Sequence, residues 1–542
     1  MYKRQGYICP FCGGKHSLIL VGLRSATAIS AGISQLYASR FNDDKKLLAF
    51  NDNVQDAAYR ASFFNARTWR FGLRTAMQHF VCDGGEGLTV DAFGDALCDY
   101  WQNRMSDEVF IDTFIPHNMA GDRAYEILQK TGEFPDEAGR KGLLSDVRKR
   151  ISYEVLLGYG LSSRIGRTLE KSAASMISPD LNRIEDVANT ILERIHNEAC
   201  VRMIRYEQLV GIVLSWMNHM RQNGAFALPI YSGYVASGAK GYLLSTKHIS
   251  WMPGGYLNPF FPALQSRGGA SSGFEALSDH CWYVRKLMQM LHTTALECPG
   301  IVQAVGIILE ELEKQKMLIR MEGPKSLPVF GLSPSFYRVT RNVGTLRCNV
   351  CGHVVSAEAA HTHYWEGMPC SRSNCAGCYV FQGQHPDYYA NLYQNGELVR
   401  VHAREHTGLL ERGDREQLEI QFKHKSNEHK AWDPNLLSCT PTLEMGIDIG
   451  DLSIVMLCSI PPSQSQYLQR IGRAGRTDGN ALAIAVANAK PHDLYFYQAP
   501  LEMIDGKVDP PGVFLNASAV LERQFVAFCF DNWVQSLSLI HI

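Results

Sequence analysis

The feature that most constrains the fold is the stretch 436–476, which alternates short apolar runs with glycine-containing turns. The apolar runs, 436–440 and 452–460, have the length and composition of strands that are buried on both faces of a parallel sheet. A helical segment follows the second run and ends in Gln-Arg-Ile-Gly-Arg-Ala-Gly-Arg, residues 469–476. Arginines three positions apart share one face of a helix, glycines let a phosphate approach the backbone, and guanidinium groups match phosphate oxygens. The stretch therefore predicts two strands of an α/β sheet, followed by a helix suited to phosphate.

Two motifs in this stretch carry a specific resemblance. The sequences TLEMGIDIGDL (442–452) and QYLQRIGRAGR (466–476) resemble motifs V and VI of superfamily 2 helicases of the DEAD/DEAH type, in the second of their two RecA-like domains. The resemblance implies that Arg473 and Arg476 are catalytic arginine fingers, which reach the γ-phosphate of an ATP held with Mg2+ mainly by the first domain. It also implies that further residues couple the nucleotide to nucleic acid: Gly446, Asp448, Gln469 and Arg470. The alternative interpretation is a solvated basic helix after a buried strand.

A third segment, LLAFNDNVQDAA (47–58), reads as a buried strand, a polar turn and the start of a helix. It resembles motif IV, the first strand of the same domain. The resemblance implies that polar residues of this loop and of motif V contact nucleic acid: Asn51, Asn53 and Gln55, and Thr442. The alternative is ordinary helix capping after a strand. The next strand of the domain follows only at 397–403. We therefore expect a RecA-like parallel sheet with helices on both faces, split by a large insertion, with the motif loops and both arginines converging at the carboxyl ends of the strands.

The insertion is mainly helical by its apolar spacing, with helices around 94–101, 124–132 and 143–157. Two more helices, 279–297 and 301–316, precede short strands at 317–321 and 335–340, which is the order of a winged-helix module. The basic stretch 140–171 fits either a solvated helix face or contact with phosphates. The predicted division is 1–22 (an end with a CxxC knuckle), 23–80 (RecA-like, first part), 81–275 (helical insertion), 276–345 (winged-helix module), 346–385 (zinc module), 386–500 (RecA-like, second part), 501–536 (C-terminal extension) and 537–542 (an end).

The cysteines predict a metal site near the end of the insertion. Cys348 and Cys351 form a C-x2-C pair, and Cys370 and Cys375 a C-x4-C pair, which is the arrangement of two knuckles around a tetrahedral structural Zn2+. Cys378 is the alternate fourth ligand. The pair Cys9 and Cys12 belongs either to a second zinc site or to a turn.

Several features of the sequence bear on the whole protein. It contains neither a G-x-x-x-x-G-K-[ST] phosphate loop nor a DEAD- or DExH-like carboxylate pair. The ends, 1–5 and 537–542, are similar to translated sequencing-adapter sequence, so we expect an internal part of a longer protein. The absence of an apolar run of about eighteen residues and of a signal peptide predicts a cytoplasmic protein. The formal net charge of −1 confines any nucleic-acid contact to a local surface.

These features together predict the C-terminal motor half of an ATP-dependent helicase or translocase that acts on DNA, or on RNA. We expect it to work with an N-terminal RecA-like domain that is missing from this chain, and the chain alone to be inactive. The alternative from another class is a non-catalytic, zinc-containing nucleic-acid-binding module on a RecA-like scaffold. The retained Arg473, Arg476 and Asp448 argue against that alternative, because a scaffold does not need them.

Overall fold

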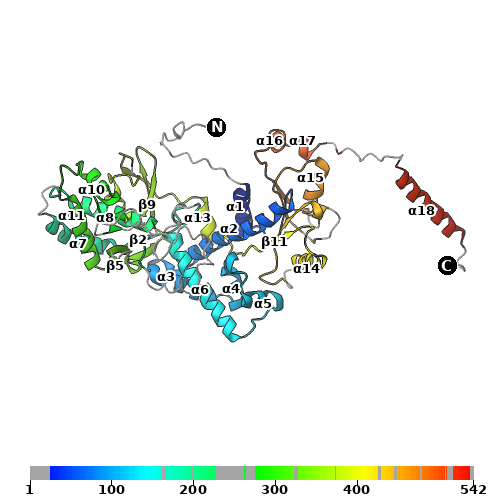
Figure 1. Cartoon of the computed structure of the whole chain (residues 1–542), viewed down its shortest axis with the longest axis horizontal. Helices are drawn as coiled ribbons and strands as arrows, with labels where there is room; N and C mark the ends of the chain where they lie inside the picture. Colours follow the sequence, from blue (N-terminus) through cyan, green and yellow to red (C-terminus); the bar gives the residue numbers. More distant parts are fainter. Residues whose placement is uncertain are drawn as a thin grey trace.

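A five-stranded parallel sheet joins the two ends of the chain across the insertion (Figure 1). The computed structural model describes residues 25–537 except 161–162, 164–165, 197–200, 224, 228–261, 264–274, 323–327, 373, 425–428, 445–448, 451, 477–478, 507 and 509–516. The sheet order is β11-β12-β1-β13-β14, from β1 (Leu47–Phe50), β11 (Ala403–His406), β12 (Leu436–Cys439), β13 (Ile454–Leu457) and β14 (Leu482–Ala485). All neighbouring strands are parallel. β1 lies in the middle of the sheet, between β12 and β13, which both follow the insertion in the sequence.

The first strand after the insertion starts later than predicted. The sequence favoured 397–403, whereas β11 begins at Ala403. The side chain of Asn435 donates to the carbonyl of Arg400 (2.8 Å) and accepts from the amide of His402 (2.8 Å). Because these backbone groups are bonded to a side chain, the regular ladder with β12 starts only after them.

Alternate residues of each strand face opposite hydrophobic cores, as expected for a sheet covered on both sides. Leu47 and Ala49 point toward α1 (Ser25–Ala38) and the first half of α2 (Val54–Phe80). Leu48 and Phe50 point toward α14 (Arg412–Lys423), α15 (Gln464–Ile471) and α17 (Leu501–Ile504). All four strand residues are completely buried, and burying a side chain as large as Leu or Phe stabilises a fold by about 1.5–3 kcal/mol.

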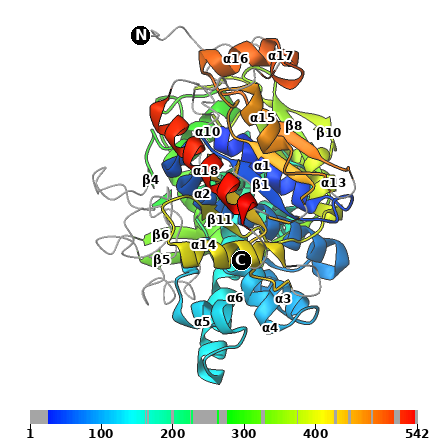
Figure 2. The same cartoon turned by 90° about the vertical axis from the view of Figure 1, so that its right-hand side faces the viewer.

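The insertion has its own, larger core, and helix α2 enters it from the sheet. The helices expected near 94–101, 124–132 and 143–157 lie within α3 (Val90–Gln102), α5 (Arg123–Thr131) and α6 (Glu137–Tyr159). The other helices of this part are α4 (Asp107–Phe114), α7 (Leu181–Ile195), α8 (Tyr206–Gln222), α10 (Trp282–Leu291), α11 (Ile301–Lys314), α12 (Thr362–Trp365) and α13 (Tyr388–Asn395). Figure 2 shows α3 to α6 gathered below the sheet, away from α16 and α17.

The strands at the end of the insertion pair differently from the expected winged-helix order. β5 (Leu318–Glu322) forms an antiparallel pair with β6 (Pro328–Leu332). β7 (Tyr337–Thr340) instead pairs with β2 (Met176–Pro179), a strand from much earlier in the chain. The two expected strands therefore belong to different sheets. β3 (Pro262–Ala263) and β4 (Glu275–Ala276) extend the first of them.

A three-stranded antiparallel sheet precedes the return to the parallel sheet. Its order is β10-β8-β9, from β8 (Val343–Cys348), β9 (Val354–Glu358) and β10 (Tyr379–Gly383). After β14, the chain continues through α16 (Pro491–Gln498), α17 and α18 (Ser518–Ser536), and α18 projects away from the body in Figure 1. Among the described residues, no helix is both long and apolar enough to cross a membrane.

Candidate functional site

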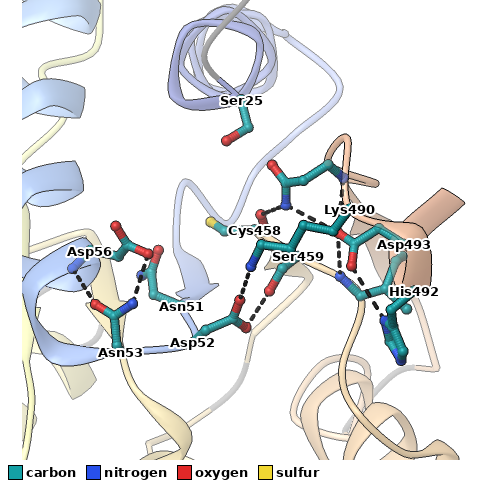
Figure 3. Close-up of polar contacts among 12 residues, drawn as sticks. Ser25, Asn51, Asp52, Asn53, Asp56, Cys458, Ser459, Lys490, His492 and Asp493 are labelled. Carbon is teal, nitrogen blue, oxygen red and sulfur yellow. Dashed lines mark hydrogen bonds and ion pairs between the residues drawn. The ribbon is translucent and has the colours of Figure 1, made fainter.

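Asn51 lies at the carboxyl end of the sheet, beside the loop residues that Figure 3 shows. It follows β1 directly and is completely buried. Its side-chain amide donates to the carbonyl of Ala49 (3.0 Å) and to the hydroxyl of Ser438 (2.9 Å), and its oxygen accepts from Arg60 (3.0 Å). The same guanidinium also donates to the carbonyl of Cys458 at 3.4 Å. Asn51 therefore ties β1, β12, β13 and α2 to one another, and its amide is not presented at the surface as the predicted contact with nucleic acid requires.

The residues after Asn51 form an exposed loop at the same edge. Asn53 caps α2, because its side-chain oxygen accepts from the backbone N–H of Asp56 at 2.8 Å. Asp52 accepts a hydrogen bond from Ser459 and lies 3.5 Å from the ammonium of Lys490. Gln55 is exposed in the first turn of α2. Asn53 and Gln55 thus lie at the surface, as a nucleic-acid contact would require, while Asp52 bridges the loops after β1, β13 and β14.

The loop after β12 is described only in part. Thr442 lies in the short 3-10 helix Pro441–Glu444. Gly446 and Asp448 lie outside the described residues, so the structure does not place the predicted coupling residues of motif V.

The arginine segment lies partly beyond the helix on which it was predicted. Helix α15 ends at Ile471, so Gln469 and Arg470 are helical, whereas Arg473 and Arg476 lie in the turn that follows. Gly472 ends the helix, and Gly475 has φ +69°, a conformation that side chains other than glycine rarely adopt. The helix is thus shorter than the spacing of the arginines predicted.

The four polar side chains of this segment have different environments. Gln469 is exposed. Arg470 is buried, and its guanidinium carbon lies 5.5 Å from the centre of the Phe50 ring, a cation–π contact. Arg473 is 4% exposed. Arg476 is exposed, and its Nε donates to the carbonyl of Gly472 at 3.1 Å.

The prediction that both arginines meet the motif IV loop at the carboxyl edge is wrong. The N–H of Gly475 donates to the carbonyl of Leu452 at 2.8 Å, just before β13 begins. A helix of eight residues is about 12 Å long, and a four-residue strand is about 13 Å long, so α15 returns the chain to the amino end of the sheet. The loop at Asn51 and the turn at Arg476 therefore lie at opposite edges.

A cavity of about 800 Å³ opens beside Arg476 at the amino edge. It is lined by residues that directly precede the strands, among them Lys46, Arg400, Asn435 and Gly450. Lys45 is engaged with Glu397 (2.8 Å), and Lys46 donates to the carbonyl of His424 (2.9 Å). Arg476 is therefore placed where a ligand that enters this cavity can meet it.

Four of the predicted zinc ligands come together. The sulfur atoms of Cys348, Cys351, Cys370 and Cys375 all lie within 4.8 Å of one another, and the residues are buried. Two pairs, Cys348 with Cys375 and Cys351 with Cys370, are 3.6 Å apart. A tetrahedron with bonds of about 2.3 Å to zinc has sulfurs about 3.8 Å apart, so the cluster fits this ion. Cys378 lies outside the cluster, where its sulfur accepts from the side chain of Asn349 at 3.3 Å.

The pKa values of the cluster thiols shift in different directions. Burial raises the pKa of Cys348, but the N–H groups of Cys351 and Val350 and the neighbouring thiols outweigh it and lower the value to about 7. Burial is the main cause that raises the pKa of Cys370 well above its usual value. Zn2+ would replace the protons of such thiols, since metal binding requires the deprotonated form.

Helix α10 fixes the second knuckle of the cluster. Trp282, Lys286 and Gln289 donate to backbone carbonyls of Ser371 (2.9 Å), Arg372 (2.9 Å) and Cys375 (2.9 Å), respectively. Lys286 is 2% exposed and also donates to the carbonyl of Cys370. A buried ammonium beside four sulfurs compensates part of the negative charge of a zinc–thiolate centre.

Three cysteines outside this cluster remain to be described. Cys9 and Cys12 lie outside the described residues, so the structure does not place the predicted second zinc site. Cys298 is disulfide-bonded.

The basic stretch 140–171 is largely engaged in ion pairs within the protein. Arg140 contacts Asp107 and Glu137, Arg148 lies 2.7 Å from Asp99, and Arg150 pairs with Glu154 in the core. Arg167 lies 3.7 Å from Asp387. These contacts favour a structural role for the stretch over contact with phosphates.

The sequence analysis missed two polar groups that organise the site. Arg60 lies nine positions after Asn51, in the second turn of α2. Its place in that helix is the signal in the sequence that could have indicated a contact with Asn51. Asp112 of α4 is buried and bonded to Nε2 of His402 (2.9 Å) and to the hydroxyl of Tyr125 (2.7 Å). Burial raises the pKa of Asp112, but the charge and the hydrogen bond of His402 outweigh it, so the net shift is downward. The bond between Asp112 and His402 links the insertion to the segment before β11. No local sequence motif indicates this contact.

The geometry agrees with a family match. Residues 382–478 match the family model described as helicase conserved C-terminal domain. The match includes β11, β12, β13 and α15 and implies a RecA-like fold, which the parallel sheet has. Residues 382–478 are therefore similar to helicase C-terminal domains, and the match supports the C-terminal half of a superfamily 2 helicase.

Individual relatives match this chain over short stretches. The chain is 30% identical to Druantia protein DruE of Escherichia coli over 154 residues, 27% of this chain and 8% of that protein. It is 38% identical to the ATP-dependent helicase HRQ1 of Saccharomyces cerevisiae over 66 residues, 12% of this chain and 6% of that one. The chain thus spans less than a tenth of the length of these relatives. The crystal structure of the DUF1998 helicase MrfA bound to DNA and AMPPNP matches 22% of this chain and 16% of its own at 27% identity, with a TM-score of 0.20.

Proposed function

We propose that this chain is the C-terminal motor half of an ATP-dependent nucleic-acid helicase or translocase. The observation that carries the proposal is the single parallel sheet built from β1 and β11 to β14, in a region that matches the helicase C-terminal domain and bears the arginine turn 473–476. An N-terminal RecA-like domain would hold ATP and Mg2+, and this half would act on that nucleotide and on a nucleic-acid strand.

The two edges of the sheet suit two different ligands. At the amino edge, the exposed Arg476 lines the large cavity, where it would stabilise negative charge on the phosphate in the transition state. Arg473, which is buried, would join it when the two domains close. At the carboxyl edge, Asn53 and Gln55 are exposed and would meet the nucleic-acid strand, whereas Asn51 would position their loop through Arg60 and Ser438.

DNA is the proposed strand, with RNA as the alternative outcome of the test. Relatives that match this chain include proteins named ATP-dependent helicases and one crystal structure of a helicase bound to DNA. The cysteine cluster is proposed to hold one structural Zn2+ that maintains the insertion, because four buried ligands leave no open position for catalysis.

The test uses the protein in which this chain is joined to an ATP-binding RecA-like domain. Arg473→Ala and Arg476→Ala should each lower the nucleic-acid-stimulated ATP turnover rate by about a thousandfold or more, as removal of arginine fingers does. Affinity for a single-stranded oligonucleotide should remain within about twofold of the parent value, because neither arginine lies at the carboxyl edge. Arg412→Ala is the matched control, because Arg412 is an exposed arginine of α14 that pairs with Glu416 of the same helix. Normal turnover with lost binding would reverse the assigned roles.

The rival function, a non-catalytic zinc-containing nucleic-acid-binding module, makes a different prediction. It requires the joined protein to bind nucleic acid without any ATP turnover that depends on Arg473 or Arg476. Measuring turnover in the same variants therefore separates the two functions.

A further inference from the structure

A second cavity, of about 350 Å³, lies between the insertion and the outer strand β11. Helix α5 forms one wall, and the segment that leads into β11 and the exposed side of α14 form the others. Arg400 lines both this cavity and the larger one beside Arg476, whereas Lys130 and Arg404 line the smaller cavity and not the larger one. Arg476, the residue assigned to ATP hydrolysis, does not line the smaller cavity. Its volume falls at the lower end of the range for ligand pockets, about 300–1,000 Å³.

Positive charge dominates the lining. Lys130, Arg400 and Arg404 face a single carboxylate, that of Glu126. Within the described part of the chain, none of these three cations forms a salt bridge. Surface cations of folded proteins usually find carboxylates or stay in open water, and a concave wall that holds three together concentrates positive potential.

Arg400 provides an independent sign that a ligand belongs here. Its Nε and Nη1 atoms are shielded from solvent and have no hydrogen-bond partner among the residues that the structure describes. The nearby carboxylate of Asp112 is already bonded to His402 and Tyr125. A guanidinium with unsatisfied donors is costly to bury, and an anion that accepts from it would remove that cost.

The titration of neighbouring groups agrees with positive potential in the cavity. Burial is the main cause that lowers the pKa of His117, and the charges of Arg400 and Arg404 lower it further. Burial likewise lowers the pKa of Arg400 itself. A bound anion would act in the opposite direction and raise both pKa values.

We propose that this cavity binds a phosphate group, with Lys130, Arg400 and Arg404 supplying the opposite charge. Gln129, Gln417 and Gln421 also line the cavity and add amide donors. A phosphate accepts several hydrogen bonds at once and suits guanidinium groups in particular. The phosphate belongs either to the backbone of a nucleic-acid strand or to a free phosphate compound, and the experiment below distinguishes these sources.

The experiment compares three variants of the whole chain. Lys130→Gln and Arg404→Gln each remove one charge from the cavity. Arg123→Gln removes the same charge from the same helix, α5, at a residue that does not line the cavity. Binding of inorganic pyrophosphate is measured by calorimetry, and binding of a single-stranded DNA oligonucleotide is measured by fluorescence anisotropy over a series of salt concentrations.

We expect each cavity variant to weaken binding of at least one probe by about tenfold or more, the effect of one charge-assisted hydrogen bond, while Arg123→Gln matches the parent chain. If the ligand is a strand backbone, the oligonucleotide is affected, and the slope of log affinity against log salt falls by about 0.7 for each cation removed. If it is a free phosphate compound, only pyrophosphate is affected. The proposal is overturned if the parent chain binds neither probe, or if the cavity variants bind both as Arg123→Gln does. ATP turnover is not measured, so failure here leaves the proposed helicase function to its own test.

Discussion

Replacing Cys351 by serine should remove the metal from the insertion. The sulfur of Cys351 lies 3.6 Å from that of Cys370, close to the separation of about 3.8 Å in a zinc tetrahedron. Serine keeps the size of the side chain but offers no thiolate, so three ligands remain. We expect metal analysis of the purified chain to return about one zinc per chain, and the Cys351→Ser variant to retain almost none after dialysis against a weak chelator.

The loss of stability follows from what the metal holds in place. A structural zinc contributes about 10–16 kcal/mol in isolated zinc-finger peptides, which are unfolded without it. Here the knuckles are also held by hydrogen bonds from α10 and by the sheet of β8 and β10. If about a third of the lower figure is lost, the destabilisation is about 3 kcal/mol, and the melting temperature falls by about 6–12 °C, as for a domain of 150–250 residues. Differential scanning calorimetry measures this shift.

Cys378→Ser is the matched control, because this sulfur is bonded to Asn349 and lies outside the cluster. It should keep the zinc and the melting temperature of the parent chain. The reasoning is refuted if Cys351→Ser retains one zinc per chain, or if Cys378→Ser loses it.

Three further predictions concern the sheet and its neighbours. The chain alone should show no nucleic-acid-stimulated ATP hydrolysis in a phosphate-release assay, because its sequence holds no phosphate loop; measurable turnover would contradict this. Asn51→Ala should destabilise the chain by about 2–3 kcal/mol in urea unfolding, since it removes the buried hydrogen bonds of Asn51 with Arg60 and Ser438. Gln55→Ala should leave stability unchanged and weaken only oligonucleotide binding. The pKa of Asp112 is lowered in the folded chain, so its carboxylate stabilises the fold above the unfolded pKa of about 3.9 and loses this effect as the pH falls below that value. Melting temperatures measured between pH 3 and 7 should therefore decline less steeply toward acid pH in Asp112→Asn than in the parent chain. An unchanged decline would exclude the mechanism.

The sheet was predictable because its strands are recognisable one at a time. The four residues of β1, of β12 and of β13 are apolar except for Ser438, and all are completely or almost completely buried. This pattern leaves few alternatives to a parallel sheet. The cysteine cluster was predictable for the same local reason, since the spacing of two pairs already defines two knuckles. The start of β11 was not predictable, because it depends on a side chain that is distant in the sequence. Asn435 forms hydrogen bonds with the backbone of Arg400 and His402, so β11 begins only at Ala403.

The position of the arginines illustrates a second limit. Spacing alone placed Arg473 and Arg476 on one helix face, and a general rule for α/β sheets placed them at the carboxyl edge. Gly472 ends the helix first, and the length of α15 returns the turn to the other edge. The pairing of β7 with β2 was beyond prediction for a related reason, because nothing near either strand identifies its partner.

Helix α2 connects the parallel sheet to the insertion. Its 27 residues span about 40 Å. Ala61 and Phe64 in its first half belong to the core under the sheet, and Trp69 and Leu73 further along belong to the core of the insertion. The returning helix α13 packs against the same helix, with the Phe71 and Tyr393 rings 4.9 Å apart.

A continuous helix with residues in both cores cannot act as a hinge unless it breaks, and α2 contains no proline. The hydrogen bonds from Asn65 to both backbone groups of Ala403 fasten the same helix to the edge strand β11. Any displacement of the sheet must therefore carry the adjoining part of the insertion with it. If the proposed function holds, the insertion would move together with the sheet during the nucleotide cycle, and the cysteine cluster, which is bonded to α10, lies within the core of that insertion.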